Sequence, residues 1–197
     1  FAFFTAMGNK LGSDVLAANA LMMQLVMLAA YGMDGFAFAA EGLAGQRLGG
    51  RDLPGFYLVV RYCSYWCCVT AGIMSLIFLV LHPVLFALLT DIPEVLLIMR
   101  QALVWLVVLP LIAAPSYLLD GVFIGSAETR YMMNTMLVSV ALVYIPAWYM
   151  TQGWGNSGLW LAFTAFNAAR GATLFWCYLR ISRDSTWLKT SEPVTKE

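Results

Sequence analysis

Residues 13–52 read SDVLAANALMMQLVMLAAYGMDGFAFAAEGLAGQRLGGRD, and this stretch decides how the chain folds. It begins with Ser13 and Asp14, residue types that favour the start of a helix. An apolar run follows that has about the length a helix needs to cross a bilayer, roughly 20 residues. The stretch ends in a glycine-rich segment that carries Arg47 and Arg51. We therefore predict a membrane-spanning helix over residues 14–41 and a loop over residues 42–54.

Polar side chains interrupt this apolar run at four positions: Asn19, Gln24, Asp34 and Glu41. At about 100° per residue, Asn19, Asp34 and Glu41 fall within roughly 60° of one another, and Gln24 lies some 80° from Asp34. A membrane helix with two carboxylates on one narrow stripe is expected to face other helices or a water-filled cavity.

The composition of the whole chain agrees with a membrane protein. Of its 197 residues, 61% are hydrophobic and 11% are charged, whereas a soluble domain has about 25% charged residues. The mean hydropathy is +0.78. The formal net charge is zero, so no basic surface points to nucleic acid, and no GxxxxGK[ST] or GxGxxG motif provides a phosphate cradle. We predict an all-α polytopic transmembrane bundle.

The other apolar runs divide this bundle into five complete spans and one partial span. Strands are excluded because the runs are too long and an open strand leaves its backbone unsatisfied in lipid. Phe1 lies inside an apolar run that is too short to cross, so we expect the chain to be a fragment cut within a helix. The predicted spans cover residues 1–9 (partial), 14–41, 55–81, 94–124, 131–150 and 158–179.

Prolines and charges add detail to this plan. The dipeptide His82–Pro83 is expected to end the third span, with a short interfacial helix and a turn after it, and Pro110 and Pro115 to kink the fourth. Arginines gather in alternate connections, and the positive-inside rule places that side of the membrane in the cytoplasm. A polar tail over residues 184–197 is expected on the same side and is expected to fray after Trp187. The basic residues of this side are Arg47, Arg51, Arg61, Arg130, Arg180, Arg183 and Lys189.

Nothing in the sequence favours an enzyme or a metal protein. The single histidine precedes a proline, and the chain has no HExxH or GxSxG motif and no paired acids of the aspartic-protease kind. There is no CxxC or Cys/His metal spacing. We expect the thiols to act as small core hydrophobes and expect no cofactor. These thiols are Cys63, Cys67, Cys68 and Cys177.

Three segments resemble one transporter family. They are YGMDGFAFAAEGLAGQRLGGRD (31–52), SYLLDGVFIGSAETRYMMN (116–134) and GLWLAFTAFNAARG (158–171). The chain resembles the multidrug and toxic compound extrusion (MATE) family, and within it the DinF-like branch. The resemblance implies that residues 1–183 are the C-terminal six-helix lobe of a twelve-helix transporter, with its seventh helix partial. It also implies an N-terminal lobe as partner and a cavity between the two lobes.

The same resemblance implies export of organic cations and other toxic compounds, driven by protons or sodium ions. The proton-coupling aspartate of the DinF-like branch lies in the first lobe, outside this chain. Sodium-coupled NorM-like members use acids in helices seven and ten. Residues 1–9 hold no acid, and Asp120 on helix ten cannot be placed in register with the sodium ligand. Protons are therefore favoured over sodium as the coupling ion.

Asp34 and Asp120 are the strongest site candidates, because a charge at the bilayer centre costs at least about 2.5–3.5 kcal/mol. Both lie about 10–15 Å from the Arg-rich ends of their helices, and Arg170 has a similar depth. We predict that Arg170 pairs with Asp34, Asp120 or Glu41, with the two aspartates favoured. The group either fixes helix packing or lines a cavity for cations or protons.

The remaining polar candidates have weaker assignments. Glu41 lies nearer the helix end and is expected to support loop or helix contacts. Asn19 and Gln24 either line the cavity or link helices by hydrogen bonds.

The leading function is a secondary antiporter in a bacterial inner membrane. Alternatives are a flippase for lipid-linked or amphipathic substrates, which a long lateral groove would favour, and a non-catalytic membrane subunit.

Overall fold

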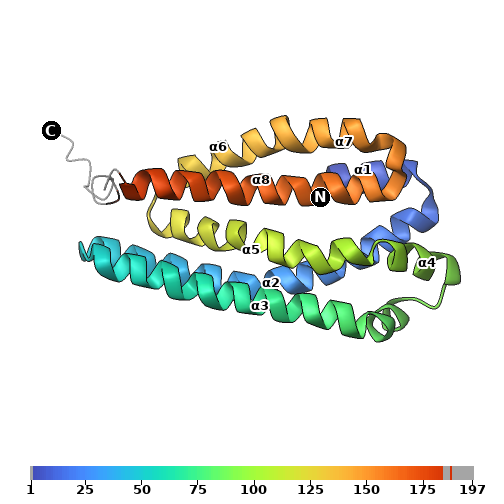
Figure 1. Cartoon of the computed structure of the whole chain (residues 1–197), viewed down its shortest axis with the longest axis horizontal. Coiled ribbons are helices and arrows are strands. Elements are labelled where there is room, and N and C mark those ends of the chain that lie inside the picture. Colours follow the sequence, from blue (N-terminus) through green and yellow to red (C-terminus); the bar gives the residue numbers. More distant parts are fainter. Residues whose placement is uncertain (1, 184–186, 188–197) are drawn as a thin grey trace.

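The computed structural model describes residues 2–183 together with Trp187. Within these residues all regular structure is helical and there is no strand, which confirms the all-α prediction (Figure 1). The elements are α1 (Ala2–Lys10), α2 (Ser13–Gly49), α3 (Leu53–Leu89), α4 (Pro93–Gln101), α5 (Leu103–Gly125), α6 (Thr129–Ser139), the π-helical turn η1 (Val140–Tyr144), α7 (Ile145–Thr151), the 3-10 turn η2 (Gln152–Trp154) and α8 (Gly155–Arg183).

Four helical stretches of the described chain are long and apolar enough to cross a membrane. Three are α2, α3 and α5. The fourth, Thr129–Arg183, reverses direction at η2 and Gly155, whose φ of 58° favours glycine. It therefore contains two antiparallel arms, α6–α7 and α8, which pack against each other (Figure 1). With the short α1, this gives the predicted five complete spans and one partial span.

The second helix continues beyond its predicted end at Glu41. It runs to Gly49, so the connection to α3 is the short turn Gly50–Asp52 rather than a long loop. The Asp52 carboxylate closes this turn by accepting a hydrogen bond from the Gly55 N–H (2.9 Å) and pairing with Arg47 (2.9 Å). The Gly55 bond, more than Arg47, lowers the pKa of Asp52 below its ordinary value.

The predicted break at His82–Pro83 is wrong, because α3 remains helical to Leu89. A proline has no N–H to donate to the carbonyl four residues earlier, which here is that of Leu79. The His82 ring occupies this place, with Nδ1 2.9 Å from the Leu79 oxygen. The imidazole therefore replaces the hydrogen bond that Pro83 removes.

The predicted fourth span, residues 94–124, is two helices rather than one. Ala102 separates α4 from α5, and α5 then stays helical through Pro110 and Pro115. Val95 and Met99 of α4 are buried in the same core cluster as Phe86 of α3. The change of direction at Ala102 keeps these apolar side chains inside the bundle while α5 begins its crossing.

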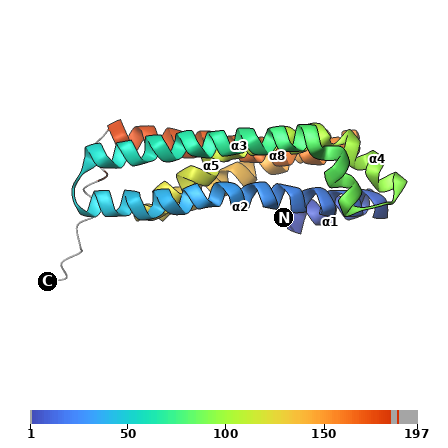
Figure 2. The ribbon, with the colours of Figure 1, turned by 90° about the horizontal axis from the view of Figure 1, so that it is seen from below.

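The helix α5 lies at the centre and packs against α2, α3 and α8. Figure 2 shows α3 and α8 on one side of α5 and α2 with α1 on the other. The backbones of α2 and α5 touch, because a Cβ on Gly121 would overlap the carbonyl oxygen of Ala37 and one on Gly125 that of Glu41. Such close approach through small residues is how helices pack in membranes without a hydrophobic driving force.

One end of the bundle carries most of the arginines, as predicted. The α2–α3 turn, the α5–α6 turn and the end of α8 meet there, while Lys10 and Arg100 lie toward the other end (Figure 1). Trp187 is buried at this end, with its ring centroid 5.0 Å from that of Phe56 and 5.9 Å from that of Phe123. The rest of the predicted polar tail lies outside the described residues.

Candidate functional site

An ion pair between α5 and α8 lies in the interior of the bundle. Arg170 Nη2 donates to Asp120 Oδ2 at 2.5 Å, and each side chain is 18% exposed. This contact confirms the prediction that Arg170 pairs with an aspartate. In the described residues, Asp120 Oδ1 and Arg170 Nε are buried and form no hydrogen bond. The pair therefore retains one acceptor and one donor for a further polar partner, because leaving such atoms unsatisfied is costly.

Asp34 and Tyr117 complete the charged site. Asp34 is half-buried on α2 and interacts electrostatically with Asp120. Tyr117 lies one turn before Asp120 on α5 and interacts electrostatically with Asp34, Asp120 and Arg170. Two carboxylates and one guanidinium give the group a formal charge of −1. Tyr117 was not among the site candidates predicted from the sequence, although its spacing of three residues from Asp120 places both on one helix face.

Glu41, the third acid proposed for Arg170, is not its partner. The carboxylate is half-buried on α2 and forms no ion pair within the described chain. The Glu41 backbone carbonyl lies against Gly125 of α5.

Asn19 links helices, and Gln24 is exposed. The Asn19 side chain is 2% exposed, donates to Asn156 Oδ1 at 2.7 Å and accepts from Trp160 Nε1 at 2.9 Å. These bonds join α2 to the start of α8. Asn19 precedes Asp34 by about 22 Å of helix at 1.5 Å per residue, so it belongs to a separate polar cluster.

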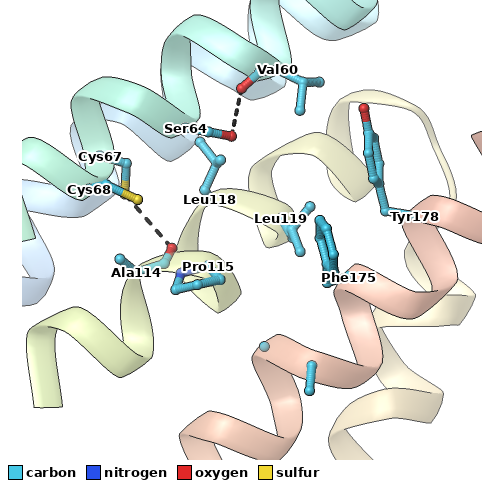
Figure 3. A pocket seen from close by; sticks show the side chains of 12 residues that line it. Val60, Ser64, Cys67, Cys68, Ala114, Pro115, Leu118, Leu119, Phe175 and Tyr178 are labelled. Atoms are coloured by element: carbon cyan, nitrogen blue, oxygen red, sulfur yellow. Dashed lines mark hydrogen bonds between the residues drawn. The ribbon is translucent and has the colours of Figure 1, made fainter.

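An apolar groove lies between α3, α5 and α8, with a volume of about 420 Å³ (Figure 3). At 100° per residue, Leu118 in its lining lies about 160° around α5 from Asp120, so the groove and the ion pair are on opposite faces. Cys67 Sγ lies 3.7 Å from the Ala114 oxygen in this lining. Cys68 also lines the groove and is exposed, unlike the other three thiols, so the prediction of four core thiols is wrong at this position.

The described residues hold no group of three or more His, Cys, Asp or Glu side chains that could bind a metal. Long apolar helices around a buried charged site define an integral membrane protein of the polytopic α-helical class.

The chain belongs to the MatE family, whose sequence pattern matches residues 1–150. It is 37% identical over 188 residues to DNA damage-inducible protein F of Escherichia coli (strain K12). The matched segment covers 95% of this chain and 40% of that protein. It is 25% identical over 171 residues to Protein DETOXIFICATION 45, chloroplastic, of Arabidopsis thaliana, covering 84% of this chain and 30% of that protein.

These matches confirm the resemblance to the MATE family and its DinF-like branch. Members of the family are transporters rather than enzymes, so a membrane-embedded enzyme is set aside. The chain spans less than half the length of either relative.

Proposed function

We propose that this chain forms one lobe of a secondary antiporter that exports organic cations and other toxic compounds in exchange for protons. The observation that carries the proposal is the formal charge of −1 at Asp34, Asp120 and Arg170 inside a membrane bundle. Membership of the MatE family and the detoxification named in one relative support the substrate class. The fraction of each relative that the chain covers supports the single-lobe interpretation.

The charge balance of the site suggests how exchange works. Arg170 neutralises Asp120, so Asp34 carries the net negative charge and has no basic partner in the described residues. A proton on Asp34 or a bound cation neutralises that charge, but both together would leave a net positive charge. Because a charge inside the bilayer is costly, proton and cation compete. Release of one therefore accompanies binding of the other, as antiport requires.

The orientation and location complete the proposal. The Arg-rich end of the bundle and the tail over residues 184–197 lie in the cytoplasm, as the positive-inside rule favours. The Escherichia coli relative supports a bacterial inner membrane.

A flippase is the second candidate, because a lateral groove exists. The groove extends from Val60 to Cys68 of α3, about 12 Å of a core that is about 30 Å thick. It has no charged lining along which a headgroup would cross. These two features favour the antiporter over the flippase.

Transport into liposomes tests the proposal. The intact protein is reconstituted with a fluorescent organic cation, and uptake is driven by a proton gradient. Asp34→Asn is expected to abolish proton-driven uptake, and Asp14→Asn, the same change at an exposed position in the first turn of the same helix, is expected to retain it. Full proton-driven transport by the Asp34→Asn protein would show that the charge balance is not the coupling device.

A further inference from the structure

We propose that the groove between α3, α5 and α8 binds one acyl chain of an anionic glycerophospholipid whose headgroup lies at Arg61. The lining favours an apolar occupant, because it contains no charged side chain. Its Ser64 hydroxyl already donates to the Val60 carbonyl at 2.7 Å. Phe175 and Tyr178 stack with ring centroids 6.5 Å apart and form one wall (Figure 3). The site is independent of the transport proposal.

The position of the groove identifies lipid as the neighbouring phase. The groove opens at the outer surface of the bundle, because Cys68, Ala172 and Phe175 of its lining are exposed. An exposed apolar surface midway along a membrane-spanning bundle meets hydrocarbon. Large apolar side chains beside the groove on α8 are also exposed, among them Phe175, Trp176 and Leu179.

The dimensions fit a lipid chain better than a helix. The lining covers eight steps on α3 (Val60 to Cys68) and seven on α8 (Gly171 to Tyr178), about 12 Å and about 10 Å. Both lengths are shorter than one leaflet, about half of a 30 Å core. A helix that crosses the membrane runs along the whole of the core, about 30 Å, so the groove is too short to hold one along its length, whereas part of an acyl chain fits it.

A basic side chain lies where the headgroup would be. Arg61 directly follows Val60 of the lining, is exposed, and forms no ion pair in the described residues. It belongs to the Arg-rich end of the bundle. Tyr62 and Tyr65 are exposed beside it, and tyrosines favour the membrane interface. An anionic headgroup would therefore meet a cation at the depth where its chain enters the groove, whereas a zwitterionic one gains less.

Lipid retention by the intact protein tests this assignment. The protein is purified with phosphatidylglycerol or phosphatidylcholine and weighed by native mass spectrometry. Arg61→Gln is expected to weaken phosphatidylglycerol binding about fivefold, from about 1 kcal/mol per basic residue. Ala172→Trp, which fills the groove, is expected to abolish the bound lipid. The matched controls are Arg100→Gln, at the other end, and Ala168→Trp, an exposed position one turn away that does not line the groove.

Several results would overturn the proposal. Equal retention of both lipids would rule out the anionic headgroup, and equal loss in the control variants would rule out the groove. A phosphatidylglycerol with a photoactivatable group in its chain should label peptides of α3 and α8. Crosslinks from Cys68 to another protein segment, with no lipid labelling there, would show a helix as the occupant instead. Thermal unfolding of each variant verifies that it is folded.

Discussion

Removal of Arg170 should leave the Asp120 carboxylate without its partner inside the bundle. The two side chains are joined at 2.5 Å and are each 18% exposed. Breaking a buried pair by removing one partner costs about 3–5 kcal/mol of unfolding free energy. Because both side chains keep some exposure, we expect Arg170→Gln to cost about 3 kcal/mol, the lower end of this range. For a unit of 150–250 residues, each kcal/mol lowers Tm by about 2–4 °C. The expected fall in Tm is therefore about 6–12 °C.

A double-mutant cycle isolates the pair. Asp120→Asn combined with Arg170→Gln strands no charge, so the double variant should be more stable than the sum of the two single losses predicts. The matched control is Asp34→Asn combined with Arg170→Gln, which leaves Asp120 stranded and removes only its repulsion by Asp34, so its rescue should be smaller. Tm is measured by thermal unfolding of the intact protein in detergent. Additive losses in the Asp120 cycle, or a rescue by Asp34→Asn as large as that by Asp120→Asn, would refute the assignment of the partner.

Three further predictions follow from the bundle. Gly121→Ala should destabilise by about 1–3 kcal/mol in thermal unfolding, because its Cβ would overlap the carbonyl of Ala37, whereas Gly35→Ala meets open space and should change little. The stability that Asp52 adds through the Gly55 N–H should be present above its ordinary pKa and be lost as the pH falls through its lowered value. Acid titration of unfolding should therefore differ between wild type and Asp52→Asn at neutral pH but not at pH values below the lowered pKa. Residues 1–197 alone should not move a cationic dye in liposomes, and gradient-driven movement would refute the single-lobe interpretation.

The local chemistry of the sequence was sufficient to predict the number of spans and which charged residues form the site. A span is recognised by its apolar length, which the bilayer imposes on each helix separately. The prediction that Arg170 needs an acid follows from the cost of an unpaired charge in hydrocarbon. The family resemblance rested on contiguous segments around Asp34 and Asp120, which the sequence displays directly.

The contacts between helices were decided by the tertiary structure. A helical pattern gives the angle of Asp34, Asp120 and Glu41 around their own helices, but not the rotation of one helix against another. The Gly121 and Gly125 contacts place α5 against α2, and Gly171 of α8 packs closely on Pro115 and Ser116 of α5. The second contact sets α8 against α5, where Arg170 meets Asp120.

The same limit applies to backbone continuity. Pro83 predicts a break, yet the His82 ring bonds to the Leu79 carbonyl and the helix continues. The sequence left Asn19 open between lining a cavity and linking helices, and Asn156 and Trp160, more than 130 positions away, are the partners that decide for a link. The sequence determined which groups need a partner in the membrane, because burial cost is a property of each side chain. The packing of α2, α5 and α8 determined which partner each one found, because that depends on distances between segments far apart in the chain.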